Sequence, residues 1–191
     1  MIHADELEAI VRRSAPLMQV LTTVRDLAIP DALLFSGAIY QRVLNVKTGR
    51  DLDFGIKDYD LGYFDASDTS YEAEDVIIKQ VAAAFDSPLK EMVEVRNQAR
   101  VHLWFESRFN EPYLPLSNSA EALSRFVSPM FAVGVRLEAD DQMTVLAPFG
   151  LEDLFNMRLR PNPNRTSPNY EKIAAAAKAR WPEITVDPLP A

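Results

Sequence analysis

Two aspartates separated by one residue, Asp58 and Asp60, lie in the segment Lys57-Asp58-Tyr59-Asp60-Leu61. On a β-strand, alternate side chains point to the same face, so the two carboxylates would lie side by side, with Tyr59 on the other face. Adjacent carboxylates repel each other unless a cation neutralises them, and hard oxygen ligands favour Mg²⁺ or Mn²⁺. The pair therefore predicts a divalent-metal site with Asp58 and Asp60 as ligands.

The Asp-x-Asp pattern is weak evidence by itself, because such pairs are common by chance and often stay solvated at a strand edge. A second pair, Asp51 and Asp53, falls in the segment 46–55, which we expect to be a loop. The first pair differs because it lies on the strand-like run 56–64. Its context, rather than the pattern, carries the prediction.

A short apolar run, 32–35, ends at Ser36-Gly37 and is followed by an amphipathic stretch that begins near Ile39. This order predicts a strand, a tight turn and a helix. Backbone N–H groups and a hydroxyl at a helix start can bind phosphate. Ser-Gly is also common in ordinary turns. The prediction of a phosphate-binding turn therefore depends on its position before the aspartate pair.

The elements around these residues alternate between helix and strand. This predicts an α+β (α/β-like) fold, a small mixed β-sheet flanked by helices. Apolar residues at helical spacing predict a helical segment over 4–28 that Pro16 kinks or divides. Other expected helices are 69–85, opened by a Thr69–Glu72 capping box, then 97–109, 119–126, 150–157 and 170–181. Other expected strands are 56–64, 92–95, 131–137 and 143–146, with a hairpin turn at 139–141. Trp104, Phe105 and Phe109 are expected in the core rather than as a base-stacking platform, and the tail from Pro182 is expected to pack loosely.

We expect one domain over 1–191, in which 1–30 is an N-terminal helical segment and 165–191 a C-terminal helix and tail. The composition, 48% hydrophobic and 25% charged residues, is that of a globular protein. A net charge of −8 disfavours extended nucleic-acid binding, which needs concentrated positive charge. It still allows a small anionic ligand that binds through a metal ion.

The absence of cysteine excludes disulfides, thiolate zinc sites and cysteine nucleophiles. The two histidines, His3 and His102, are far apart in sequence and do not favour a zinc site. The first residues lack a secretory pattern. No apolar run approaches the roughly 20 residues of a membrane helix. We therefore expect a cytoplasmic protein that contacts no membrane.

Two segments together resemble the polymerase-beta-like nucleotidyltransferase superfamily. They are Phe35-Ser36-Gly37-Ala38-Ile39-Tyr40-Gln41 and Asp58-Tyr59-Asp60-Leu61-Gly62-Tyr63-Phe64-Asp65. The stretches 58–65, 97–104 and 147–155, with 160–163, more narrowly resemble a largely uncharacterised bacterial nucleotidyltransferase family, and this likeness covers about 32 to 164.

The resemblance implies a nucleotidyltransferase fold that binds an NTP and Mg²⁺ or Mn²⁺. It implies transfer of a nucleoside monophosphate to an acceptor hydroxyl, the acceptor being an unknown small molecule or protein. Asp58 and Asp60 correspond to the metal ligands, and Ser36 and Gly37 to the phosphate-binding turn. Two features depart from the superfamily: the turn is Ser-Gly-Ala, and the interval from Gly37 to Asp58 is longer.

The resemblance also implies a third carboxylate, which would bind metal or act as general base. Glu94, on the strand after the intervening helix, is the candidate, and a solvated surface glutamate is the equal alternative. Arg42 lies on the helix after the turn, where it could meet phosphate. Asn97 and Arg100 would share a helix face at i, i+3 and could contact the nucleotide.

Two other functions stay open. A catalytically silent relative could use the same fold to bind a nucleotide or a partner. A metal-dependent glycosyltransferase could use Asp-x-Asp for a nucleotide sugar, but its fold usually needs a longer chain and a larger parallel sheet, so it ranks last.

Overall fold

In the computed structural model, which describes residues 1–190, a mixed five-stranded sheet forms the centre of the molecule. Its strands are β1 (Leu33–Phe35), β2 (Tyr59–Tyr63), β3 (Val93–Asn97), β4 (Gly134–Leu137) and β5 (Met143–Leu146), in the order β3-β2-β1-β4-β5. β1 is antiparallel to β2 and β4, and β4 and β5 form an antiparallel hairpin. β2 and β3 are parallel. The expected α+β class with a small mixed sheet is confirmed.

Helices flank this sheet. The α-helices are α1 (Ala4–Arg12), α2 (Ala15–Asp26), α3 (Gly37–Lys47), α4 (Tyr71–Ala83), α5 (Leu89–Met92), α6 (Phe105–Phe109), α7 (Glu152–Phe155) and α8 (Tyr170–Arg180). The 3₁₀ helices are η1 (Gln98–Leu103), η2 (Ala120–Arg125) and η3 (Pro129–Phe131). No helix of residues 1–190 is both long and apolar enough to cross a membrane.

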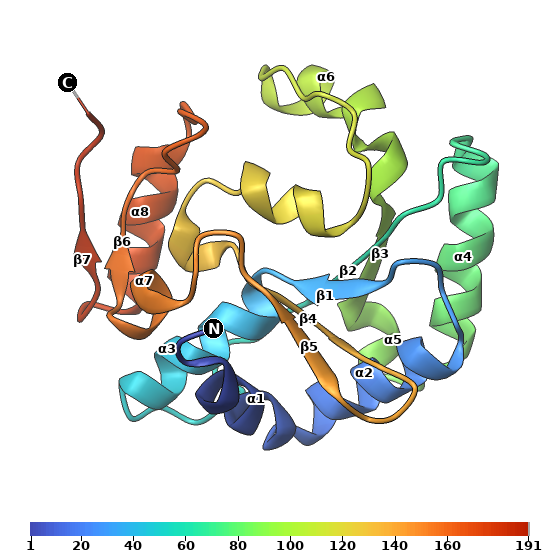
Figure 1. Cartoon of the computed structure of the whole chain (residues 1–191), viewed down its shortest axis with the longest axis horizontal. Helices are drawn as coiled ribbons and strands as arrows, with labels where there is room; N and C mark the ends of the chain where they lie inside the picture. The colour runs from blue at the N-terminus through green and yellow to red at the C-terminus, as the bar shows by residue number, and fades with distance from the viewer. Residues whose placement is uncertain (191) are drawn as a thin grey trace.

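The two faces of the sheet are covered by different parts of the chain (Figure 1). Leu34, Leu61 and Val95 point into the main core together with residues of the N-terminal helices and α3. On the other face, Leu33 and Phe35 pack in a smaller cluster against Leu123 of η2. In Figure 1 the segment from η1 to η2 runs over that second face and α6 projects beyond it.

The N-terminal helical segment divides between α1 and α2, as Pro16 predicted. The side chain of Ser14, the N-cap of α2, accepts a hydrogen bond from the N–H of Leu17 at 3.3 Å. Pro16 lies in the first turn of α2, where backbone N–H groups have no intrahelical acceptor. Its lack of an N–H therefore costs the helix no hydrogen bond.

Several boundaries differ from the prediction. β2 begins at Tyr59, so Asp58 precedes the strand. The capping residue of α4 is Ser70 rather than Thr69, because the Ser70 hydroxyl accepts from the N–H of Ala73. The helix expected over 97–109 is wrong: η1 and α6 are separate, broken where Trp104 adopts a non-helical φ of −126°.

The last part of the chain is more ordered than expected. β6 (Arg158–Leu159) and β7 (Thr185–Val186) form a separate parallel pair. Trp181 and Ile184 are buried in the main core. The tail after Pro182 therefore does not pack loosely, since β7 returns it to the body of the protein.

The long loop 48–58 is tied to α3. The amide nitrogen of Asn45 donates to the carbonyl oxygens of Leu52 and Phe54, at 3.1 and 2.9 Å. The side-chain oxygen of Asn45 accepts from Trp181 Nε1 at 3.1 Å. These bonds hold the chain where it turns toward Asp58, so the loop takes up the longer interval between Gly37 and that residue.

Candidate active site

Strand register brings the predicted residues together. Asp60 lies opposite Phe35 of β1 on one side and opposite Glu94 of β3 on the other. Directly paired residues share a face of the sheet, so the two carboxylates lie on the face that η1 and η2 cover. Phe35 is followed at once by Ser36-Gly37. One end of this sheet face therefore carries the turn and both acids.

The turn itself has an unusual backbone. Ser36 has φ 63° and ψ −137°, a conformation that glycine adopts far more readily than serine. α3 starts at the next residue; the N–H groups of Ile39 and Tyr40 donate to the Ser36 carbonyl, which leaves those of Gly37 and Ala38 without an intrahelical acceptor. A Cβ built on Gly37 would lie 3.9 Å from Asp58 Oδ1, so the Asp58 carboxylate is close to the turn. It would also lie 2.5 Å from Gln41 Nε2, so the end of that flexible side chain would have to move.

Burial and several neighbouring groups shift the pKa of the Asp60 carboxyl group. Its pKa is raised to about 6, first by burial and then by the charges of Asp58 and Glu94. The hydrogen bond from Ser36 and the charge of Arg96 act in the opposite direction. The three acids thus interact, and a cation near Asp60 would relieve their repulsion.

The donor set fits a Mg²⁺ ion that shares its ligands with a substrate. Within residues 1–190, no group of three or more His, Cys, Asp or Glu side chains could hold a metal by itself. Mg²⁺ is commonly held by one or two carboxylates and completed by water and substrate phosphates. Asp58 and Asp60, both half-buried, supply such a pair.

Two cavities meet the site. The smaller, about 170 Å³, is lined by Asp60, Glu94 and Arg96 of the sheet and by aromatic residues of the covering segment. The larger, about 450 Å³, begins at Ser36 and Tyr40. Three aromatic residues line both cavities: Phe105, Tyr113 and Phe126.

Glu94 is open to this site. Its side chain is 55% exposed, and its nearest cation, Arg96 Nη2, is 3.8 Å away. A carboxylate that is accessible and only loosely paired can reach a substrate group. The structure therefore keeps Glu94 as the candidate third acid.

Arg42 does not reach the site, which corrects the expectation that it meets phosphate. Its side chain is fully buried and donates to the Ala38 carbonyl, to Tyr59 Oη at 3.0 Å and to Asp53 Oδ1. Asp53 also accepts from the Ser14 hydroxyl at 2.8 Å. The second Asp-x-Asp pair thus contributes one aspartate to a structural network.

Asn97 and Arg100 are also engaged elsewhere, so the expected nucleotide contact is replaced by a structural role. Asn97 is buried, and its amide bonds both backbone groups of Asp65, at 3.1 and 2.8 Å. Arg100 donates to the buried carboxylate of Glu74. Asn97 pairs with Tyr63, at the far end of β2 from Asp60. Its side chain points to the opposite face from that of Glu94.

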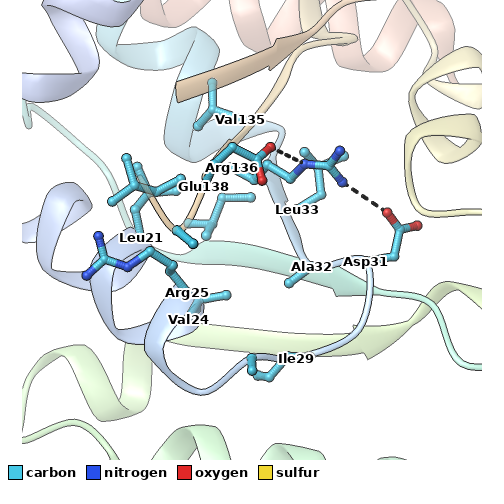
Figure 2. A pocket seen from close by; sticks show the side chains of 14 residues that line it. Leu21, Val24, Arg25, Ile29, Asp31, Ala32, Leu33, Val135, Arg136 and Glu138 are labelled. Carbon is cyan, nitrogen blue, oxygen red and sulfur yellow. Dashed lines mark hydrogen bonds and ion pairs between the residues drawn. The ribbon is translucent and has the colours of Figure 1, made fainter. Parts of the chain in front are cut away.

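A separate cavity of about 260 Å³ lies at the start of β1, away from the turn that follows its end. Figure 2 shows Arg136 in this cavity, where its guanidinium bonds Glu138 at 2.9 Å and Asp31 at 3.2 Å. Both partners neutralise the arginine, so this cavity offers little unpaired charge to an anionic ligand.

Sequence reasoning missed the aromatic walls. Phe109 was expected in the core, but it is 40% exposed and lines the larger cavity. Phe105 packs on Tyr113, with ring centroids 4.4 Å apart. The dense aromatic spacing over 104–113 was a visible signal. The missing information was the distance to Ser36 and Asp60, which only the fold supplies.

Comparisons with known proteins agree with this geometry. A nucleotidyltransferase family model matches residues 22–186. A solved NMR structure titled as revealing a CCA-adding enzyme head domain is similar with a TM-score of 0.75 and 24% identity, over 96% of this chain and 95% of that one. At this identity the likeness shows the fold alone. No curated protein matches significantly. Because the family model spans most of the sequence, the chain belongs to the nucleotidyltransferase family.

Proposed function

We propose that this protein transfers a nucleoside monophosphate from an NTP to an acceptor hydroxyl, with Mg²⁺ or Mn²⁺ as cofactor. The observation that carries the proposal is the register of three strands, with Asp60 between Phe35 and Glu94. It joins a phosphate-binding turn, a metal-binding carboxylate and a candidate base on one sheet face.

The turn and the aspartates have different roles in binding the NTP. The N–H groups of Gly37 and Ala38 bind triphosphate oxygens, because they have no intrahelical acceptor and lie at the positive end of the helix dipole. Asp58 and Asp60 hold the metal ion beside them. When bound, the ion neutralises phosphate charge and stabilises the entering and leaving oxygens.

Glu94 acts on the acceptor. Its exposed carboxylate takes the proton of the acceptor hydroxyl as the new oxygen–phosphorus bond forms at the α-phosphate. The bond from that phosphorus to the bridging oxygen breaks, and pyrophosphate leaves. Arg96 Nη2 lies 3.8 Å from this carboxylate, which stays 55% exposed.

The alternative is a silent relative that binds nucleotide without transfer. It is favoured by the lack of a preassembled three-acid cluster within residues 1–190. Both functions need Asp58 and Asp60 for binding, and only the first needs Glu94.

The test is calorimetric titration with each NTP in the presence of Mg²⁺, on the protein and on the Asp58→Ala/Asp60→Ala variant. Asp51→Ala is the matched control, because it alters an exposed aspartate of the other Asp-x-Asp pair. We expect binding that the double variant abolishes and the control keeps. Tight NTP binding without either carboxylate would refute the metal site. Carboxylate-dependent binding without pyrophosphate release in a metabolite screen would favour the silent relative.

A further inference from the structure

The cavity of about 450 Å³ beside the turn has the size of a small-molecule site, typically roughly 300–1,000 Å³. Ser36 and Tyr40 form its end next to the triphosphate turn, and Phe109 and Ile173 form a partly exposed rim. A ligand anchored at Ser36 can therefore extend into an aromatic chamber.

The walls suit a flat ring. Phe105, Tyr113 and Phe126 line this cavity and also the smaller one beside Asp60. Aromatic side chains bind nucleobases by stacking, because every base has a π-face. The two cavities thus share aromatic walls, over which Arg165 and Arg125 also lie.

The polar groups of the lining are all hydroxyls or guanidinium groups, and the lining holds neither a carboxylate nor an amide side chain. Arg165 is committed, because it donates to the Arg125 carbonyl and to Glu111. Within residues 1–190, the only hydrogen-bond partner of the Arg125 guanidinium is Glu121, 3.2 Å from Nη2, and its Cζ lies 6.0 Å from the Tyr113 ring centroid. One N–H of Nη2 and both N–H groups of Nη1 have no hydrogen-bond partner, and together they form a fork of two parallel donors.

We propose that this cavity binds the nucleoside of the donor and that Arg125 reads the base edge, so that guanine is preferred over adenine. Guanine presents two acceptors, O6 and N7, to which an arginine can donate in bidentate fashion. Adenine presents an amine beside N7, which suits asparagine or glutamine instead. This assignment rests on the proposed function, since it takes the triphosphate to lie at Ser36-Gly37.

The experiment separates the base from the phosphates. Inorganic tripolyphosphate, ATP and GTP are titrated in Mg²⁺ into the protein and into Arg125→Gln and Phe109→Ala. We expect GTP to bind at least about tenfold more tightly than ATP, the range of one bidentate base contact. Arg125→Gln should remove or reverse that ratio, because glutamine pairs with adenine. Phe109→Ala should weaken both nucleotides about fivefold or more and leave tripolyphosphate unchanged.

Arg12→Gln is the matched control, because Arg12 also pairs with a glutamate four residues earlier but lies on α1. It should leave all three affinities unchanged. The inference is overturned if GTP and ATP bind no better than tripolyphosphate, or if the Arg125 variant leaves their ratio intact, as it would were the cavity the acceptor site. Failure of the proposed function looks different: tripolyphosphate binding would then not depend on Asp58 and Asp60.

Discussion

Asp60 and Glu94 stand directly opposite each other on the parallel strands β2 and β3. Their charges, with that of Asp58, oppose ionisation of a carboxyl group that burial already disfavours. The protein without metal therefore holds an unfavourable charge at its candidate active site. This is the common condition of a site built for a cation rather than for stability.

Asp60→Asn should stabilise the metal-free protein at pH 8. The folded-state pKa of Asp60, about 6, exceeds its ordinary value of 3.8. The cost of ionisation is therefore present in full above pH 6 and disappears as the pH falls below 3.8. At about 1.4 kcal/mol per pKa unit, the gain is at most roughly 3 kcal/mol. Thermal unfolding with a chelator should show a higher Tm at pH 8 and an equal Tm at pH 3.5. An equal Tm at both values would contradict the charge argument.

Substitutions at Ser36 distinguish the effect of its backbone conformation on stability from the effect of its hydroxyl group. Ser36→Gly relieves the left-handed backbone and should stabilise the protein by about 1 kcal/mol over Ser36→Ala, which keeps the strain. Both variants lose the hydroxyl bond that lowers the Asp60 pKa. Urea unfolding of the pair measures the backbone term directly. Equal stability of the two variants would mean that the backbone at this position relaxes at no cost.

Glu94→Gln should separate binding from chemistry. Mg²⁺-dependent NTP affinity should change little, while turnover falls by roughly 10²–10⁴-fold, the contribution of a general base. The rate of slow NTP hydrolysis, in which water replaces the unknown acceptor, can be measured before that acceptor is identified. Glu91→Gln, an exposed acid of α5, is the control and should leave the rate unchanged. If the protein is a catalytically silent relative, neither the unsubstituted protein nor the Glu94 variant would hydrolyse NTP.

Arg42→Met should damage the fold rather than the affinity. Removing one member of a buried charged network costs on the order of 3 kcal/mol, because Tyr59 and Asp53 lose their donor. Arg12→Met, in an exposed ion pair, should cost less than about 1 kcal/mol. Denaturant titration measures both. A weakened NTP affinity with unchanged stability would restore the phosphate-binding role predicted from sequence.

The local parts of the site could be predicted from sequence. A Ser-Gly pair after an apolar run marks the turn at Ser36, and alternation marks the strand that carries Asp60. Both signals involve residues within a few positions of each other, where backbone preferences dominate. Glu94 was proposed because its strand follows the intervening helix, and the parallel pairing of β2 with β3 brings it to the same face as Asp60.

The contacts of the arginine side chains could not be predicted from local sequence. Arg42 bonds Asp53 and Tyr59, which are 11 and 17 residues away. Arg100 bonds Glu74, 26 residues away. A charged side chain that follows a phosphate-binding turn looks the same in sequence whether it faces solvent or is buried. Only the packing of distant elements decides between the two.

The bonds from Asn45 to Leu52 and Phe54 close the loop 48–58 upon itself before it reaches Asp58. At its outer end, Gly49 has φ 68°, and a side chain added there would meet nothing within 4 Å. The positive φ would nevertheless strain any side chain placed at position 49. Lys47, which is exposed at the end of α3, is therefore the better attachment point for a fluorescent reporter or a surface tether.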